Sequence, residues 1–380
     1  MIFKISKTIF SNALQTVSRA VSSNSPLPAL SGIKISVKED FITLVGSDSD
    51  ISVKVDLSNE INSNTNLVVS STGEMVIDAR FINEIVKKID SNEIKFELID
   101  GTLIQISGIS TEYKINGIRP IDYPNIDFTL LDDTFVINSK LLAEVINQTY
   151  FATSDTETRP VLTGVNFKCS DNKLKCVATD SYRLSQKEVE LENNYEFNIT
   201  IPKKSLIEIQ RSLINDENIK VNISENKAQF LINNIIIQTR LIDGDYPNVD
   251  KLIPTNFDYE LKIQSKDLLT AIDRTSFIKL DGINIIKLSC NTDNVSIKSE
   301  SNEVGSSYQD VDVISYVGND LKISFSGQYV HDALKAINSN VVKISFSGEM
   351  KPFVITSDDN QNNTQLVLPI RTYNWYLERY

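Results

Sequence analysis

The chain contains an internal repeat, and this repeat limits the folds that its 380 residues can adopt. The residues Tyr-Pro-Asn-Ile-Asp that begin at Tyr123 return as Tyr-Pro-Asn-Val-Asp at Tyr246. After each copy comes a segment, 135–142 or 259–269, that resembles the first residues of the chain. Self-similarity at a fixed period indicates one structural unit that is used several times. We therefore predict three similar domains, at residues 1–131, 132–255 and 256–380.

Each repeat begins with a short strand, which is followed by a polar residue and a helix. The polar residue, Ser6, Ser139 or Ser265, is predicted to be the N-cap, because its hydroxyl can accept a hydrogen bond from a free amide of the first turn. In the first helix the apolar residues recur every three or four positions, which is typical of a helix with one buried face. These residues are Ile9, Ala13, Leu14, Val17 and Val21.

Strands and a second helix follow in each repeat. Residues 33–37 and 51–55 alternate between apolar and polar side chains, the pattern of a sheet with one buried face. The second helices are predicted at residues 79–89, 203–213 and 328–337. Helix pairs packed on one side of mainly antiparallel sheets make an α+β fold. The short polar junctions near residues 130–133 and 254–257 favour domains that abut rigidly.

Composition excludes several classes of protein. The three cysteines, Cys169, Cys176 and Cys290, lack the spacing of a metal or redox site and are predicted to be reduced. Because His331 is the only histidine, a Ser-His-Asp triad or a His-rich metal site has almost no residues from which to form, and neither a metal nor a cofactor is expected. The sequence also lacks a Gly-rich phosphate loop and any apolar run of about 20 residues. We expect a soluble cytoplasmic protein.

Three acidic clusters are candidates for a chemical role. The clusters are Asp48-Ser49-Asp50, Asp132-Asp133 and Asp358-Asp359. Carboxylates of this kind can bind a metal or act as a catalytic pair. Each cluster lies beside Asn, Ser or Gly at a predicted turn, which favours solvated turn carboxylates. A carboxylate-based hydrolase is therefore one alternative function for this chain. A second alternative, which rests on the repeat and not on the acidic clusters, is a repeat-built structural or adhesion protein without a DNA role.

Basic residues gather on the predicted helices, although the formal charge of the chain is -12. If the equivalent helices of all repeats face one another, their basic sides form a positive lining. Such a lining binds phosphate groups without reading base sequence, and an acidic exterior suppresses other contacts with DNA. The residues are Lys7, Arg19, Arg80, Lys87, Lys88, Lys140, Lys203, Lys204, Arg211, Lys266, Arg274 and Lys335.

Five motifs occur in order along the chain. They are Pro26-Leu27-Pro28-Ala29-Leu30, Thr158–Val165, Ala178–Ser185, Asp243–Asn248 and Leu366–Arg371. Together they resemble the bacterial sliding clamp family, the beta subunits of DNA polymerase III. The resemblance covers essentially the whole chain and is specific, because several unrelated motifs keep the same order. It implies three DNA-clamp domains in each chain and a head-to-tail homodimeric ring.

The resemblance also implies a function without catalysis. Members of the family encircle duplex DNA, with helices inside and sheets outside, and slide because phosphate contacts are weak and independent of sequence. The expected partners are double-stranded DNA, a second copy of the chain, the replicative polymerase, the clamp loader and repair proteins, and no membrane partner is expected. Tethering holds the polymerase at high effective concentration near its template, which makes synthesis processive.

A hydrophobic cleft between the second and third domains is the family's second site, and it binds short peptides of the Gln-Leu-x-Leu-Phe kind. Aliphatic and aromatic residues suit the burial of peptide anchors, while Arg183 and Thr179 can satisfy polar groups. The resemblance assigns the wall of the cleft to Leu162, Thr179, Ser181, Tyr182, Arg183, Leu184, Pro247, Lys251, Leu252, Tyr329, Pro352, Val367, Leu368, Pro369, Ile370 and Arg371.

DNA contacts and the dimer interface are also implied by the resemblance. The DNA contacts map onto Asn24, Arg80, Thr156, Pro160 and Val161, and Asn24 is neutral where relatives often carry a basic residue. The interface is expected to join an edge strand of the first domain to the third domain, because sheet continuation protects exposed edges. Its expected residues are Leu103, Ile104 and Ile106 in the first domain, and Phe277 and Ile278 in the third.

An aromatic segment, residues 374–380, follows the Pro369-Ile370-Arg371 stretch near which relatives usually finish. Two interpretations stay open. The segment is either a frayed terminus or a tail that covers the peptide cleft.

Overall fold

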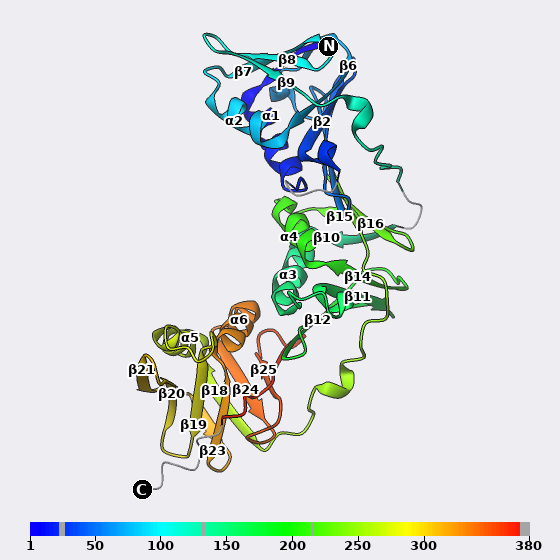
Figure 1. Cartoon of the computed structure of the whole chain (residues 1–380). Helices are drawn as coiled ribbons and strands as arrows, with labels where there is room; N and C mark the ends of the chain where they lie inside the picture. The colour runs from blue at the N-terminus through cyan, green and yellow to red at the C-terminus, as the bar shows by residue number, and fades with distance from the viewer. Residues whose placement is uncertain (23–26, 131–133, 215, 373–380) are drawn as a thin grey trace. The chain divides into compact units, whose positions relative to one another are not determined.

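The computed structural model describes residues 1–22, 27–130, 134–214 and 216–372, and Figure 1 shows the chain as a cartoon. Within the described residues there are six α-helices, and the strands of every sheet pair antiparallel, which confirms the α+β prediction. The chain divides into two compact units, Met1–Leu142 with Lys204–Leu241 and Ala143–Lys203 with Ile242–Tyr380.

The first repeat contains two α-helices and nine strands among its described residues. Its elements are β1 (Ile2–Ser6), α1 (Lys7–Ser18), η1 (Pro28–Ser31), β2 (Gly32–Val37), β3 (Phe41–Ser47), β4 (Ile51–Ser58), η2 (Ser63–Thr65), β5 (Val68–Ser71), β6 (Gly73–Asp78), α2 (Ala79–Lys88), β7 (Glu93–Asp100), β8 (Leu103–Ser107), β9 (Glu112–Asn116) and η3 (Pro120–Asp122).

The second and third repeats also begin with a strand and a helix, and their second helix follows after four and five further strands, respectively. The second contains β10 (Thr134–Asn138), α3 (Ser139–Thr149), η4 (Tyr150–Ala152), η5 (Pro160–Thr163), β11 (Gly164–Ser170), β12 (Lys173–Thr179), β13 (Arg183–Glu190), β14 (Phe197–Pro202), α4 (Lys203–Ser212), β15 (Asn218–Ile223), β16 (Lys227–Ile232), β17 (Ile235–Arg240) and η6 (Asp250–Leu252). The third contains β18 (Tyr259–Gln264), α5 (Ser265–Thr275), β19 (Ile285–Cys290), β20 (Val295–Ser301), β21 (Gly305–Asp310), β22 (Ser315–Val317), β23 (Leu321–Ser326), α6 (Gly327–Ile337), β24 (Val341–Phe346), β25 (Phe353–Thr356) and β26 (Asn363–Val367).

Two of the four sheets continue from one repeat into the next. In the first unit, the order β10-β15-β16-β17-β4-β3-β2-β6 joins strands of the first and second repeats through the β17–β4 pair. In the second unit, the order β14-β11-β12-β13-β26-β25-β24-β18-β22 joins the second and third repeats through β13–β26. The other two sheets, β5-β1-β7-β8-β9 and β21-β20-β19-β23, each lie within one repeat.

The prediction that Ser6, Ser139 and Ser265 act as N-caps is wrong. Ser6 occupies the N-cap position of α1 but makes no side-chain capping bond. Ser139 and Ser265 are the first residues of their helices. The Ser139 hydroxyl accepts a hydrogen bond from the Glu217 amide at 3.1 Å, and the Ser265 hydroxyl donates one to the Ser339 carbonyl. Ser139 and Ser265 therefore link the starts of α3 and α5 to loops that are distant in the sequence.

Helix α1 packs closely on the sheet beneath it. The predicted stripe is confirmed at Ala13, Leu14 and Val17, which are buried. Phe10 is also buried, while Ile9 and Val21 at the predicted ends of the stripe are only half-buried. Gly46 on β3 allows this approach, because a β-carbon at that position would lie 2.3 Å from the carbonyl oxygen of Val17. A side chain at residue 46 would push α1 off the sheet.

An aspartate fixes the turn between β8 and β9. Asp90 accepts hydrogen bonds from the amides of Ile109 at 3.2 Å and Ser110 at 3.0 Å, and from the hydroxyls of Ser110 and Thr111. The hydroxyl bonds, that from Ser110 above all, hold the pKa of Asp90 well below its usual value. The ionised carboxylate therefore anchors the hairpin that carries β9.

Replacement of Asp90 by alanine is expected to remove a contribution to the free energy of unfolding that depends on pH. Because the folded-state pKa of Asp90 is lowered, its contribution is complete above the ordinary pKa of 3.8 and is lost as the pH falls below that value. We expect Asp90→Ala to lower the free energy of unfolding at pH 7, and the gap from the wild type to shrink below pH 3.8. Urea unfolding between pH 7 and pH 3 measures this gap. A gap that is independent of pH would contradict the anchoring role.

The three cysteine thiols are buried and form no disulfide. Burial raises the pKa of Cys290 to about 12 and that of Cys176 well above its usual value. Thiols in this state are poor nucleophiles and behave as small apolar side chains.

Candidate functional site

The turn between β12 and β13 is built by two of its own side chains. Thr179 Oγ1 accepts a hydrogen bond from the Ser181 amide at 3.1 Å and donates one to the Arg183 carbonyl at 2.6 Å. Asp180 Oδ1 accepts from the amides of Tyr182 and Arg183, both at 2.9 Å. Ser181 adopts a left-handed backbone with φ of 78°. The closed turn presents the Tyr182 ring, 63% exposed, to solvent.

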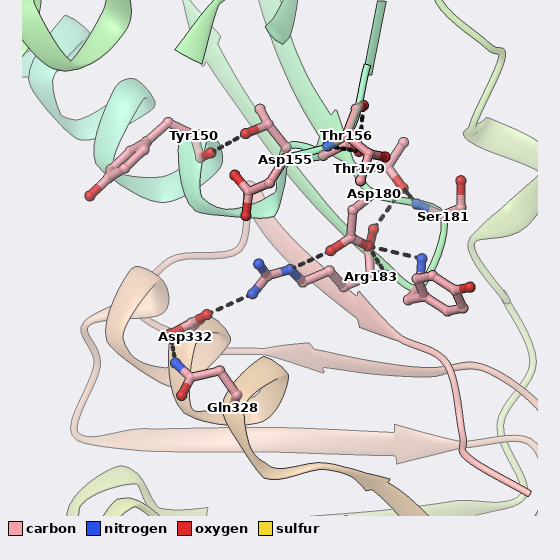
Figure 2. Close-up of polar contacts among 12 residues, drawn as sticks. Tyr150, Asp155, Thr156, Thr179, Asp180, Ser181, Arg183, Gln328 and Asp332 are labelled. Carbon is pink, nitrogen blue, oxygen red and sulfur yellow. Dashed lines mark hydrogen bonds and ion pairs between the residues drawn. The ribbon is translucent and has the colours of Figure 1, made fainter. Parts of the chain in front are cut away.

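Arg183 connects the second and third repeats, as Figure 2 shows. Its Nε donates to Asp180 Oδ2 at 2.9 Å, and one terminal nitrogen donates to Asp332 Oδ2 on α6 at 2.6 Å. The guanidinium carbon lies 4.5 Å from the ring centre of Tyr329 and 5.4 Å from that of Phe151. Only 13% of the Arg183 side chain is exposed. Two carboxylates and two aromatic rings therefore hold this side chain in one position.

An apolar cluster lies beside Arg183 where the two repeats pair. Leu184 of β13 is opposite Leu366 of β26, and the Leu368 amide donates to the Tyr182 carbonyl at 2.9 Å. The buried members are Val177, Leu184, Val249, Val354 and Leu366, with Tyr246, Ile253 and Leu368 half-buried against them. The Tyr246 hydroxyl accepts a hydrogen bond from the Thr179 amide at 3.1 Å, and burial raises the pKa of Tyr246.

The predicted cleft residues occupy three kinds of position. Leu162, Thr179, Leu184 and Val367 are buried. Arg183, Pro247, Tyr329, Pro352, Leu368, Pro369 and Ile370 are half-buried, and Ser181, Tyr182, Lys251, Leu252 and Arg371 are exposed. Direct contacts connect residues 179–184 with Tyr329 and with residues 366–368. Their role in binding a peptide stays a prediction.

Sequence reasoning missed three residues that hold Arg183 in place: Asp180, Asp332 and Phe151. Asp180 left a signal, because an aspartate that precedes Ser-Tyr-Arg at a turn can accept hydrogen bonds from the next amides. No local sequence signal points to Asp332 or Phe151, since both lie on other elements that are distant from Arg183 in the sequence.

Eight of the twelve basic helix residues are engaged within the chain. The Lys7 amine donates to the Ile89 carbonyl at 2.6 Å and so closes the end of α2. Arg19 and Arg211 both bind Glu208, whose side chain is buried. The other ion pairs are Arg80–Asp78, Lys88–Glu84, Lys140–Asp216, Lys203–Asp155 and Lys204–Asp48.

The remaining helix cations are exposed, and none forms an ion pair within the described part of the chain. They are Lys87, Lys266, Arg274 and Lys335. Of the other predicted DNA contacts, Thr156 and Pro160 are exposed, Val161 is half-buried, and Asn24 lies outside the described residues. Contacts of the basic helix residues with DNA stay a prediction.

The acidic clusters are structural where they are described. Asp48 accepts the amides of Asp50 and Ile51 through one carboxylate oxygen and pairs with Lys204 through the other. No group of three or more His, Cys, Asp or Glu side chains among residues 1–22, 27–130, 134–214 and 216–372 is placed to hold a metal ion. Over the same residues, no helix is long and apolar enough to span a membrane.

Three family models match the chain in succession. They describe the N-terminal, central and C-terminal domains of the DNA polymerase III beta subunit and match residues 1–127, 136–248 and 250–371. The chain belongs to the DNA polymerase III beta subunit family, the bacterial sliding clamps. Its function is that of a sliding clamp in DNA replication, and the adhesion alternative is not supported.

Individual sliding clamps agree with this assignment over their full length. The beta sliding clamps of Staphylococcus epidermidis and Staphylococcus aureus are each 38% identical over 376 residues, which is 98% of this chain and 100% of the relative. The crystal structure of the DNA polymerase sliding clamp from Bacillus subtilis is 36% identical, with a TM-score of 0.93, and covers 98% of this chain and 100% of that chain.

The edge strand of the first clamp domain differs from the one that the sequence predicted. Leu103, Ile104 and Ile106 belong to β8, which pairs with β7 on one side and β9 on the other. The edges of this sheet are β5 and β9, and β9 is the edge strand next to β8. Ile104 and Ile106 are also buried in the clamp's own core. In the third repeat, Phe277 is 66% exposed and Ile278 is buried.

The C-terminal aromatic segment of this sliding clamp, residues 374–380, lies outside the described residues. Its two interpretations therefore remain as the sequence left them.

Proposed function

We propose that two copies of this chain close head to tail into a ring around duplex DNA and act without catalysis. The match to three beta subunit domains in order carries this proposal. The domains run over residues 1–131, 132–255 and 256–380, and the ring works in the cytoplasm, on the nucleoid. Because phosphate contacts are independent of sequence, the ring slides along the duplex, and its topology prevents sideways release.

The first-domain side of the dimer interface is proposed to be β9. An edge strand carries unpaired backbone amides and carbonyls, which favour pairing with another strand. Among the residues that the structure describes, β9 pairs with β8 alone, and the residues of β9 are exposed or half-buried. The partner surface is proposed to lie in the third repeat, whose own edge strand β21 pairs with β20 alone.

A second proposed function is the binding of short linear peptides from the polymerase, the clamp loader and repair proteins. The surface between Arg183 and the Leu184–Leu366 cluster supports this role, because a rigid cation lies beside half-buried aliphatic side chains. Apolar anchors of a peptide would cover Leu368, and polar groups of the peptide would meet Arg183 and Thr179.

A fluorescent Gln-Leu-Ser-Leu-Phe peptide tests this binding role. We expect saturable binding to the wild type and about tenfold weaker binding to Leu368→Ala, because the partial burial of a leucine contributes about 1.5 kcal/mol. Arg183→Ala is expected to weaken binding by at least as much, because Asp332 and the Tyr329 ring lose their partner. The measurement is anisotropy as a function of protein concentration.

The control is Ile121→Ala, which shortens an aliphatic side chain that is exposed and lies outside the proposed wall. It should bind the peptide like the wild type. Equal losses in Ile121→Ala and Leu368→Ala would reject the peptide-binding role, and absence of saturable binding to the wild type calls for one further variant. Deletion of residues 374–380 then distinguishes an occluding tail, for which binding recovers, from a surface that binds no such peptide.

A further inference from the structure

The turn that presents Tyr182 in the second repeat has a duplicate in the first repeat. Ser47 Oγ accepts a hydrogen bond from the Ser49 amide at 3.1 Å and donates one to the Ile51 carbonyl at 3.0 Å. Asp48 Oδ1 accepts from the amides of Asp50 and Ile51 at 3.0 and 2.9 Å. Ser49 has a left-handed backbone with φ of 86°. Each bond has its counterpart among residues 179–183.

The strands next to these two turns also correspond. Ser52 on β4 is opposite Gln238 on β17, just as Leu184 on β13 is opposite Leu366 on β26. Two positions further along, Arg240 takes the place of Leu368. The surface around Leu184, Leu366 and Leu368 therefore has a counterpart at Ser52, Gln238 and Arg240, where three leucines are replaced by polar residues.

A cavity of about 710 Å³ opens at this counterpart. Ser52, Gln238 and Arg240 line it together with Pro124, Ile126 and Lys227. Pro124 and Ile126 belong to the Tyr-Pro-Asn-Ile-Asp copy, so they correspond to Pro247 and Val249 of the other surface. Both surfaces therefore share the apolar part of the wall. The positions that correspond to the three leucines are polar in the cavity.

Arg240 is the cation that is open to a ligand in this cavity. Its side chain is exposed, and its guanidinium forms no ion pair with any described residue. Lys227, in contrast, lies near Asp127, whose pKa is lowered by hydrogen bonds from Thr129 and further by the charge of Lys227. Gln238 Oε1 accepts from Gln229 at 2.9 Å, which leaves the NH₂ group of Gln238 as a donor. Two carboxylates, Asp50 and Asp127, also line the cavity and restrict where a second acid can bind.

We propose that this cavity is a second peptide site, which takes an acidic side chain where the first site takes leucine. The proposal rests on the peptide-binding function proposed above. A carboxylate can accept two hydrogen bonds from the Arg240 guanidinium and a third from Gln238, whereas a leucine would leave both groups desolvated. An extended partner segment with Asp or Glu at its anchor positions is therefore the matching ligand.

Two labelled peptides that differ only at the anchors test this inference: Gln-Leu-Ser-Leu-Phe and Gln-Glu-Ser-Glu-Phe. We expect the acidic peptide to bind the full-length wild type saturably. Arg240→Ala should weaken its binding at least tenfold, and Arg240→Lys should restore part of the loss. Leu368→Ala should leave acidic-peptide binding unchanged. The matched control is Arg274→Ala, which removes an exposed arginine on α5 that also lacks an ion pair with the described residues.

The possible outcomes separate the two proposals. Binding of the leucine peptide without any binding of the acidic one would overturn the second site and leave the first intact. Acidic-peptide binding that is lost in Leu368→Ala, or that Arg240→Ala and Arg274→Ala weaken equally, would also overturn it. Failure of the leucine peptide alone would count against the first site, while an Arg240-dependent acidic peptide would still support the second.

Discussion

Replacement of Lys114 by proline is expected to convert the dimer into monomers without unfolding the chain. In the β8–β9 hairpin the Gly117 amide donates to the Thr102 carbonyl and the Gly108 amide donates to the Thr111 carbonyl. Backbone groups alternate in direction along an antiparallel strand. The odd-numbered residues of β9 therefore point toward β8, and the amide of Lys114 points outward.

Proline at residue 114 removes one outward amide and places a ring where a partner strand would pair. A buried acceptor that loses its donor costs about 1–3 kcal/mol, so each interface should weaken about ten- to hundredfold. Light scattering coupled to gel filtration, over a dilution series, measures the change in mass. The β8–β9 bonds are retained, so the circular dichroism spectrum should stay that of the wild type.

Two variants at the same edge serve as controls. Lys114→Ala keeps the amide and breaks only an exposed ion pair with Glu112, so it should remain dimeric. Tyr113→Pro removes an amide that points toward β8 and should destabilise the fold. A Lys114→Pro protein that stays dimeric at every concentration of the series would exclude β9 from the interface.

Phe96→Ala is expected to destabilise the first repeat strongly. The Phe96 ring stacks on Phe3 with centroids 4.8 Å apart and lies 4.9 Å from Phe10, and all three side chains are fully buried. Truncation of a buried phenylalanine costs about 3–5 kcal/mol, because transfer energy is lost and a cavity remains. Urea unfolding should show an earlier transition for the first repeat, which makes the curve less cooperative.

Phe81→Ala is the matched control, since the Phe81 ring is exposed on α2. Its effect should stay near 0.5 kcal/mol, as is usual for surface positions. Equal midpoints for Phe96→Ala and Phe81→Ala would show that the three-ring cluster contributes nothing special to stability.

The elements with strong local patterns could be predicted from the sequence. The second helices, predicted at 79–89, 203–213 and 328–337, are found at Ala79–Lys88, Lys203–Ser212 and Gly327–Ile337. Apolar periodicity sets these helices because each must bury one face. It does not distinguish an edge strand from an interior one. The resemblance implied an edge strand around Leu103, Ile104 and Ile106, but β8 lies between β7 and β9, and the alternating pattern that β8 and β9 share cannot tell the two positions apart.

Site residues were harder to predict because their roles depend on partners that are distant in the sequence. Arg183 was assigned through the resemblance, yet the carboxylate that fixes it, Asp332, is 149 residues away. The ion pairs of the basic helix residues could not be predicted for the same reason. A count of lysines and arginines on helices does not show that Glu208 or Asp216 neutralises them.

The continuous β-ladders between successive repeats determine where mechanical strain can be relieved. Residues 51–55 pair with 235–239, and residues 183–187 pair with 363–367, so each junction is held by a row of backbone hydrogen bonds. Bending either junction would break several of these bonds together. We therefore expect neither junction to act as a hinge when force is applied to the chain.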